Sequence, residues 1–211
     1  MRTVGIDLAA EPAKTAIAVV EWRSQVAEVV AVELPGTDEA VLRHSVAADK
    51  VGIDCPLGWP DNFVRFLNAH HEHRLSFPDE VSSAEWRRSL AYRRTDEYVR
   101  STVGIIPLSV ATDRIGVTAM RAARLQVLLA AHGHTIDRAG SGLVVEVYPA
   151  AGLFRWDLPS RRYKGNDGRT ELSSLVDQLQ RAAPWLLLGA NEQTCRRSDH
   201  VLDAVVSALL A

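Results

Sequence analysis

The stretch VGIDLAA at residues 4–10 decides the fold, because its first four letters return at 51–54 in VGIDCPLG. Each copy is a short apolar run that ends on an acid, Asp7 in the first and Asp54 in the second. Such runs are typical of buried strands. An acid at the end of a buried strand is costly unless it is paired, protonated or bound to a cation. The two aspartates are therefore the first candidates for a functional site.

The spacing of the apolar runs around this stretch predicts a sheet with mixed strand directions. Runs at residues 3–9, 15–22 and 25–34 follow one another too closely for helical crossovers, which favours an antiparallel meander. A predicted helix at 37–48 then leads to a strand at 50–54. Because a strand reached through a helix runs parallel to a neighbour, the two VGID runs are expected to be neighbouring parallel strands.

The remaining chain alternates between helical patterns and one more strand. Residues 59–115 are rich in His, Arg and Trp, and we predict a mostly helical insertion there. A fifth strand is expected at 142–149. Three further helices are predicted, at 117–133, 168–183 and 198–211. We therefore predict a single α/β domain over residues 1–211, with a five-stranded mixed sheet flanked by helices, in the element order of the ribonuclease H-like fold.

Composition narrows the class of protein. The chain has 211 residues, 47% hydrophobic content and a formal net charge of −2, so it carries no global basic field. Arginines nevertheless cluster at 86–100 and 155–164, which allows a locally basic groove. No apolar run approaches the ~20 residues that span a membrane, and Cys55 and Cys195 lack the spacing of a zinc site. We expect a cytoplasmic protein that has no contact with membranes.

Further acids lie in apolar surroundings. Glu146 has large apolar neighbours on both sides, and Asp203 lies between Leu202 and Ala204, past the first turn of its predicted helix. Asp199 lies near the start of the same helix, where the helix dipole alone favours an acid. Simpler explanations exist for each acid: a strand-end or turn position for Asp7 and Asp54, a buried ion pair for Glu146, and a solvated stripe for the helical pair.

Chain order favours a shared role for these acids. Ligands of open α/β sheets collect outside the carboxyl ends of parallel strands. Carboxylates are the natural ligands of Mg²⁺ and Mn²⁺, and two such ions about 4 Å apart assist phosphodiester hydrolysis. We therefore expect Mg²⁺ or Mn²⁺ as the cofactor, with the following catalytic residues: Asp7, Asp54, Glu146 and Asp203. The same four residues together with Asp199 are the predicted metal ligands.

Six motifs occur in a fixed order: VGIDLAA, VGIDCPLGWP, YRRTDEYVR, VVEVYPAA, YKGNDGR and HVLDAVVSALLA. In this order they resemble the domain of unknown function 429 family over nearly the whole chain. The resemblance implies a ribonuclease H-like fold and a nuclease with a metal-dependent site at Asp7, Asp54, Glu146 and Asp203. Arg93 of the third motif matches a family signature.

Basic residues are candidate phosphate contacts. Arg93 could reach a phosphate bidentately, although a helix-surface arginine paired with a nearby acid fits equally well. Lys164 and Arg169 flank two glycines before a helix, where a loop can cradle a phosphate. A plain loop fits this pattern too. A second metal site at His70 and His73, one helical turn apart, is much the weaker interpretation.

The leading hypothesis is a metal-dependent nuclease whose partner is nucleic acid. Asp38 and Glu39 are the acids offered by the predicted helix at 37–48, whereas Asp54 on the fourth strand fits a Holliday-junction resolvase arrangement better. One alternative is a non-catalytic binding module that uses aromatic side chains of the insertion. An actin-like phosphotransferase is less favoured, because LAAEPAKT (8–15) lacks the glycines of a phosphate loop.

Overall fold

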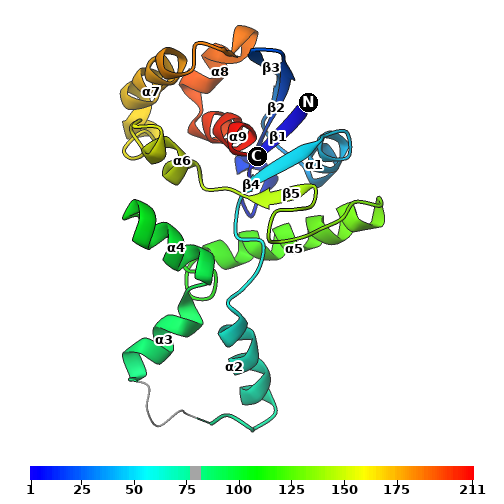
Figure 1. The fold of residues 1–211 in the computed structure, drawn as a ribbon, viewed down its shortest axis with the longest axis vertical. Coiled ribbons are helices and arrows are strands. Elements are labelled where there is room, and N and C mark those ends of the chain that lie inside the picture. The colour runs from blue at the N-terminus through cyan, green and yellow to red at the C-terminus, as the bar shows by residue number, and fades with distance from the viewer. Residues whose placement is uncertain (77–81) are drawn as a thin grey trace.

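The computed structural model describes residues 1–76 and 82–211 (Figure 1). Within this part of the chain the strands form one six-stranded sheet in the order β5-β4-β1-β2-β3-β6. The strands are β1 (Arg2–Asp7), β2 (Ala16–Arg23), β3 (Val26–Glu33), β4 (Lys50–Asp54), β5 (Val144–Glu146) and β6 (Leu186–Leu187). The protein is thus a mixed α/β structure with helices on both faces of the sheet.

Strand register aligns the two VGID runs. The meander β1-β2-β3 is antiparallel, and β4 lies parallel to β1 with Asp7 opposite Asp54. β5 lies parallel to β4 with Glu146 opposite Ile53. These pairings confirm the predicted strand directions. The predicted count of five strands is wrong by one, because the two-residue β6 pairs in parallel with β3 and is too short to produce a sequence pattern.

Helices connect and cover these strands. Along the chain they are α1 (Asp38–Ser45), α2 (Asp61–His71), α3 (Ser83–Ala91), α4 (Arg94–Val103), α5 (Ile115–Ala131), α6 (Pro149–Arg155), α7 (Arg169–Ala182), α8 (Glu192–Arg197) and α9 (Asp199–Leu210). Of the predicted helices, α1, α5, α7 and α9 lie within two to three residues of the expected bounds. The expected fifth strand is shorter than predicted, because Pro149 begins α6 instead.

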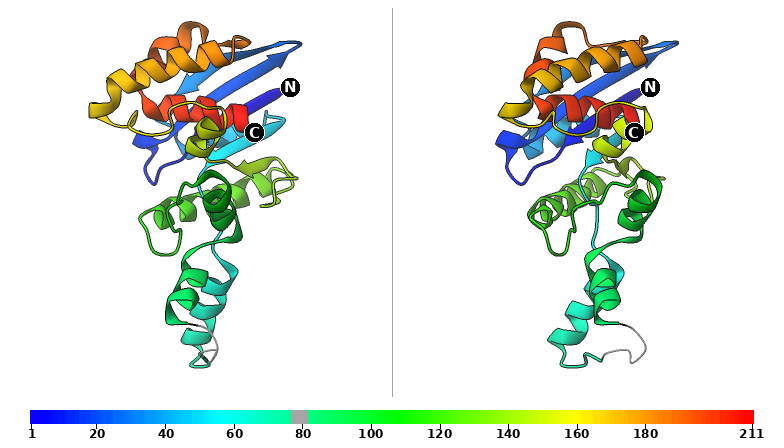
Figure 2. Two further views of the ribbon diagram at one scale, coloured as in Figure 1. Left: turned by 60° about the vertical axis from the view of Figure 1, so that its left-hand side comes forward. Right: turned by 90° about the vertical axis from the view of Figure 1, so that its left-hand side faces the viewer.

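The two faces of the sheet carry side chains of different size, and each face is covered by its own layer of helices. On one face the large residues Ile6, Ile17 and Ile53 pack with residues of α1 and α5. On the other face Ala16 and Ala18 pack with α6 to α9. The small side chains let α9 lie directly on the sheet, which the views in Figures 1 and 2 show.

The predicted insertion at 59–115 contains α2, α3 and α4, and residues 77–81 of it lie outside the described residues. α2 and α3 project away from the sheet, whereas α4 lies beneath α6 (Figures 1 and 2). Edge-on packing of Phe66 against Trp86 joins α2 to α3. In the described parts of the chain, no helix combines the length and apolar character needed to cross a membrane.

Candidate metal centre at the sheet edge

Three acids converge at the carboxyl ends of β1 and β4. Asp7 and Asp54 end these strands in register, and Asp203 reaches them from the second turn of α9. One carboxylate oxygen from each lies within 4.8 Å of the others. Asp203 is 1% exposed, while the two strand acids are partly buried. Among the described residues this is the one group of acids, histidines and cysteines close enough to hold a metal ion.

Two glycines place Asp203 in this group. Gly5 and Gly52 are register partners on β1 and β4, under α9. A β-carbon at Gly5 would lie 1.9 Å from the carbonyl oxygen of Ala204, and one at Gly52 would lie 2.3 Å from that of Ser207. Any larger residue at either position would therefore lift α9 off the sheet and carry Asp203 away from the strand acids.

The electrostatics of Asp54 favour a cation. No other described residue forms a hydrogen bond or ion pair with its side chain. Burial, followed by the negative charges of Asp7 and Asp203, raises the pKa of the Asp54 carboxyl well above its ordinary value of 3.8. A carboxyl in this state binds either a proton or a metal ion, and an ion would remove the repulsion among all three carboxylates at once.

Asp203 has partners on both oxygens. The Tyr163 hydroxyl donates to Oδ1 at 2.8 Å, and the Lys164 ammonium lies 2.6 Å from Oδ2. Burial raises the pKa of Asp203, although Lys164 opposes that shift. Lys164, a predicted phosphate contact, places its charge at the cluster, where it compensates one of the three carboxylates.

His200 borders the cluster from the first turn of α9. Its Nδ1 lies 2.6 Å from Oδ2 of Asp7. The hydrogen bond to Asp7 raises the pKa of His200 above its ordinary 6.5, and burial only partly offsets it. Sequence reasoning missed this residue. Because His200 and Asp203 are three residues apart on one helix, their shared face was a usable signal.

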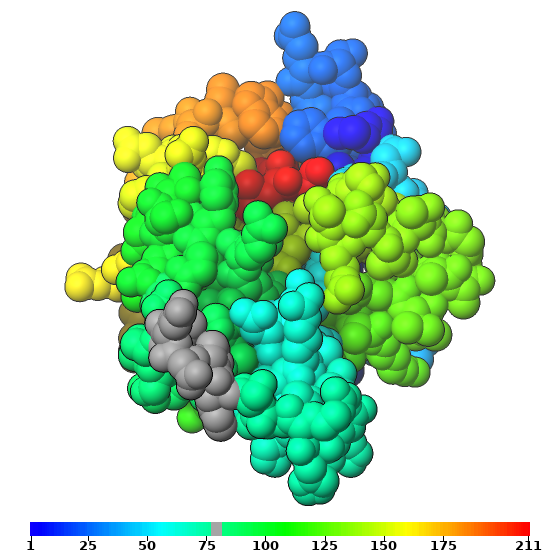
Figure 3. All heavy atoms as spheres, turned by 60° about the horizontal axis from the view of Figure 1, so that its bottom comes forward, coloured from blue at the N-terminus to red at the C-terminus, as the bar shows by residue number. Residues whose placement is uncertain are grey.

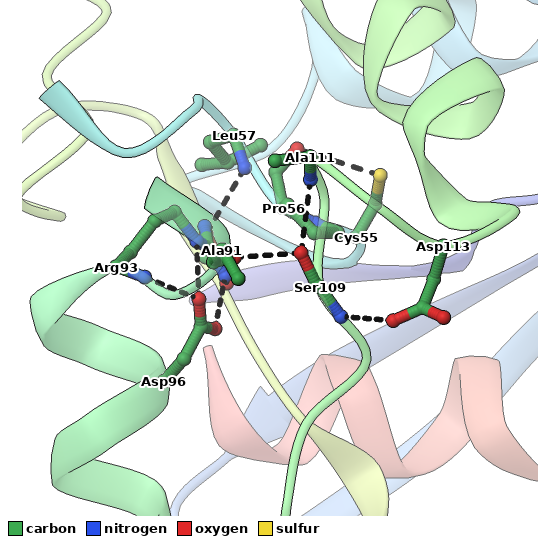
Figure 4. Close-up of polar contacts among 10 residues, drawn as sticks. Cys55, Pro56, Leu57, Ala91, Arg93, Asp96, Ser109, Ala111 and Asp113 are labelled. Carbon is green, nitrogen blue, oxygen red and sulfur yellow. Dashed lines mark hydrogen bonds and ion pairs between the residues drawn. The ribbon is translucent and has the colours of Figure 1, made fainter. Parts of the chain in front are cut away.

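Glu146 is placed beside the cluster but not in it. Arg93 donates Nη1 to Oε2 at 2.6 Å and Nη2 to Oε1 at 2.7 Å, and the Leu57 amide donates to Oε2 at 3.0 Å. Arg93 also donates to Asp96, from Nε to Oδ2 at 3.0 Å and from Nη2 to Oδ1 at 2.7 Å. Figure 4 shows Arg93 and Asp96 facing one another at the start of α4, with Leu57 close by. We call these three charged residues, Arg93, Asp96 and Glu146, the arginine clamp.

The carboxylates of the arginine clamp occupy the hydrogen-bond donors of the Arg93 guanidinium. The side chain of Arg93 is 12% exposed, and that of Asp96 is 3% exposed. Despite burial, which lowers it, the hydrogen bonds to Glu146 and Asp96 raise the pKa of Arg93 above its ordinary value, so the guanidinium stays charged. With both of its edges bound to carboxylates, Arg93 has no free edge for a phosphate.

Other predicted residues lie outside the cluster. Oδ2 of Asp199 accepts a hydrogen bond from the Gly165 amide at 3.1 Å. Nη2 of Arg169 lies 3.5 Å from Oδ1 of Asn166. Asp38 joins α1 to α5 through Arg121 and Arg124. His70 and His73 belong to no group of metal-binding side chains within the described ranges.

A cavity of about 330 Å³ opens over the strand acids. Its lining includes Asp7, Asp54, Lys164 and the arginine clamp, with an apolar wall at the other side. Cys55 also lines it, but burial raises the pKa of this thiol, so it is unsuited to act as a nucleophile. The cavity gives the cluster access to a ligand.

The donor set fits a hard divalent cation. Mg²⁺ and Mn²⁺ prefer carboxylate oxygens and retain bound waters, and an open cavity over the acids leaves room for such waters. The three carboxylates face the cationic groups of Lys164 and His200, and Asp54 is left without a partner in the described chain. Asp7, Asp54 and Asp203 are therefore the residues that would hold the ion.

A comparison with protein families finds one match. The family model described as "Protein of unknown function (DUF429)" covers residues 5–211. Comparisons with curated proteins and with solved structures find no match. The matched residues include every member of the cluster and of the arginine clamp.

Proposed function

Because the chain belongs to the DUF429 family, whose description names no activity, we propose a function from the carboxylate cluster: a metal-dependent phosphodiesterase that acts on nucleic acid. One observation carries the proposal. Asp7, Asp54 and Asp203 bring carboxylate oxygens within 4.8 Å of one another, and the Asp54 carboxyl has no hydrogen-bond or ion-pair partner among the described residues. Such a group costs stability unless it binds a cation.

The position of the cluster supports this function. It lies at the carboxyl ends of parallel strands, where α/β proteins bind ligands. The strand order β5-β4-β1-β2-β3 and the direction of each strand agree with the plan of the ribonuclease H-like fold. That plan supports the nuclease assignment, although the site and not the fold must carry it.

Each residue of the site has a part in the proposed reaction. Asp7, Asp54 and Asp203 hold Mg²⁺ or Mn²⁺. When bound, the ion supplies positive charge that stabilises the charge developing on the phosphate and lowers the pKa of water. The Lys164 ammonium lies beside the cluster. Once the ion neutralises the Asp203 carboxylate, this ammonium is free to attract the anionic substrate.

His200 is the candidate proton donor. The hydrogen bond to Asp7 raises the pKa of His200, which favours the imidazolium, and fixes the direction of its ring. An imidazolium in this position can give a proton to the leaving oxygen. Tyr163 keeps Asp203 oriented through its hydroxyl and does not itself contact the substrate.

The number of ions follows from the available ligands. We propose one ion at the three aspartates. The two-ion scheme needs a further acid, and the nearest candidate, Glu146, has both oxygens bound by Arg93. Isothermal titration with Mn²⁺ measures the stoichiometry, and two ions per chain would contradict this part of the proposal.

Cleavage assays test the activity. Purified protein is incubated with single-stranded, duplex, hybrid and branched substrates in Mg²⁺, Mn²⁺ or EDTA. We expect metal-dependent cleavage that Asp7→Asn and Asp54→Asn reduce by at least about 100-fold, since each removes a ligand of the ion. Asp177→Asn is the matched control, because Asp177 is half exposed on α7, where it pairs with Arg196. The proposal fails if wild type and Asp7→Asn are equally inactive on every substrate.

A further inference from the structure

A second cavity adjoins the one over the acids. It measures about 630 Å³ and lies between α4 and α6. The two cavities share a wall made by Val99 of α4 and by Val147 and Tyr148, which follow β5. Figure 3 shows the green atoms of α4 beside the yellow atoms of the segment after α6 on this face. We call this second cavity the α4–α6 groove.

Exposed aromatic rings line the α4–α6 groove. Tyr98 of α4 is 69% exposed, and Trp156, which follows α6, is 37% exposed. Within the described residues neither ring packs on another aromatic ring. Trp22 and Trp86, by contrast, pack against Trp185 and Phe66. Two open rings in one groove provide faces on which planar groups of a ligand can stack.

Positive charge in this groove is uncompensated. Arg94 and Arg155 line it, both are exposed, and neither forms an ion pair with an acid in the described ranges. The acid in the lining is Glu146, whose charge is already bound by Arg93. The groove therefore favours an anionic ligand, unlike the neighbouring cavity, where acids outnumber basic groups.

We propose that the α4–α6 groove binds single-stranded nucleic acid, with bases stacked on Tyr98 and Trp156 and phosphates in contact with Arg94 and Arg155. Aromatic rings alternating with arginines suit a single strand, because its bases present free faces beside a charged backbone. A duplex keeps its bases stacked inside and offers only phosphates. The direction of the strand toward the acids rests on the proposed nuclease function, whereas binding in the groove does not.

Fluorescence anisotropy tests the groove. The full-length protein is titrated in EDTA, so that no cleavage occurs, into labelled oligothymidine of about 12 nucleotides and into a duplex of equal length. We expect at least tenfold preference for the single strand. Tyr98→Ala and Trp156→Ala should each weaken it by about tenfold, as expected when one base loses its stacking partner. Tyr98→Phe, which keeps the ring, should bind as wild type does.

Arginine variants test the phosphate contacts. Arg94→Ala and Arg155→Ala should weaken binding to every sequence and lower the slope of log affinity against log salt by about one each. Phe154→Ala on α6 and Arg100→Ala on α4 are matched controls, because both residues are exposed and neither lines the groove. Thermal melting of each variant verifies that it folds.

Equal affinity for single strand and duplex would overturn this proposal, and so would unchanged binding after Tyr98→Ala and Trp156→Ala. Preferential binding of an apolar peptide at the same residues would overturn it as well. Hydrolysis of bis(p-nitrophenyl) phosphate in Mn²⁺ separates this proposal from the nuclease activity. Asp7→Asn should abolish that hydrolysis, while the control variants Phe154→Ala and Arg100→Ala should leave it unchanged. Strand binding without hydrolysis would leave the groove standing and reject the nuclease.

Discussion

Two groups of acids lie side by side at one edge of the sheet, and they differ in their partners. In the arginine clamp, Asp96 and Glu146 share one guanidinium that donates to both, and the Leu57 amide adds a further hydrogen bond. In the cluster of Asp7, Asp54 and Asp203, burial and mutual repulsion raise the pKa of Asp54. The clamp is electrostatically satisfied and holds α4 against β5, whereas the carboxylates of the cluster repel one another.

The difference in partners shows what distinguishes the two groups of acids. Burial alone does not, because Asp96 is 3% exposed and Asp203 1% exposed. The arrangement of hydrogen-bond donors does. A guanidinium fills the acceptor sites of two carboxylates with fixed geometry, whereas single partners such as Lys164 leave acceptor sites open. Four changes test this contrast, in order of decreasing expected effect.

Removing the guanidinium should have the largest effect. Arg93→Ala leaves two carboxylates in a buried setting with no countercharge, so we expect a loss of about 3–5 kcal/mol in the free energy of unfolding. Urea denaturation measures it. Arg100→Ala, an exposed arginine on the same helix, should change stability by no more than about 0.5 kcal/mol. A loss below about 1 kcal/mol for Arg93→Ala would mean that the clamp is not a stabilising unit.

Removing a carboxylate from the cluster should weaken metal binding far more than removing one from the arginine clamp. Asp54→Asn and Asp203→Asn should each weaken Mn²⁺ binding by more than about 100-fold, since they remove a ligand. Glu146→Gln should leave the affinity within about fivefold, because Glu146 contacts Arg93 and not the ion. Titration calorimetry of each folded variant measures these values. Equal losses for Glu146→Gln and Asp54→Asn would place Glu146 in the metal centre after all.

Acid pH should act on the cluster through Asp54. Since its folded pKa is raised above 3.8, metal-free stability due to Asp54 is greatest at low pH and is lost as pH rises from 3.8 through the raised value. The Asp54→Asn variant does not suffer this loss. Its stability relative to wild type should therefore increase as the pH rises from 3.8 through the raised pKa of Asp54. Metal must displace the proton, so affinity should fall about tenfold per pH unit below the raised pKa.

Urea midpoints of wild type and Asp54→Asn between about pH 4 and pH 8, in EDTA and in Mg²⁺, measure both trends. A stability difference that stays constant with pH in EDTA would show that Asp54 is an ordinary acid. Taking the difference between the two proteins removes the contribution of other titrating groups, His200 among them.

Removing the ammonium of Lys164 should have the smallest effect, with opposite signs for the two ligands. Its side chain is 55% exposed, and it competes with the ion for Asp203. Lys164→Met should therefore strengthen Mn²⁺ binding by about two- to fivefold, the range of a partly exposed pair. Turnover should fall, because the rim loses its charge for the phosphate. Weaker metal binding would mean that Lys164 orients Asp203 instead of competing for it.

Much of the cluster could be predicted from the sequence. Asp7, Asp54 and Asp203 stood out because each interrupts an apolar run, and the order of strands indicated that the strand acids would meet. Glu146 interrupts such a run as well, yet its partner is Arg93, 53 positions away in the insertion. That contact depends on how α4 docks against β5, which no local pattern encodes.

Short elements were beyond prediction for a related reason. β6 has two residues and α8 has six, too few for a periodic pattern to develop. They form because neighbouring parts of the sheet and of α7 are already in place. No sequence pattern singled out Tyr98 and Trp156. What distinguishes them from other surface aromatics is their position along one groove.

The glycine pair under α9 has a consequence for the timing of assembly. Residues 5 and 52 are made early in synthesis, whereas Asp203 leaves the ribosome after every strand. The nascent sheet therefore carries a bare glycine surface and two unpartnered aspartates until α9 docks on it. The three aspartates therefore come together in one late step, the same step in which α9 completes the core.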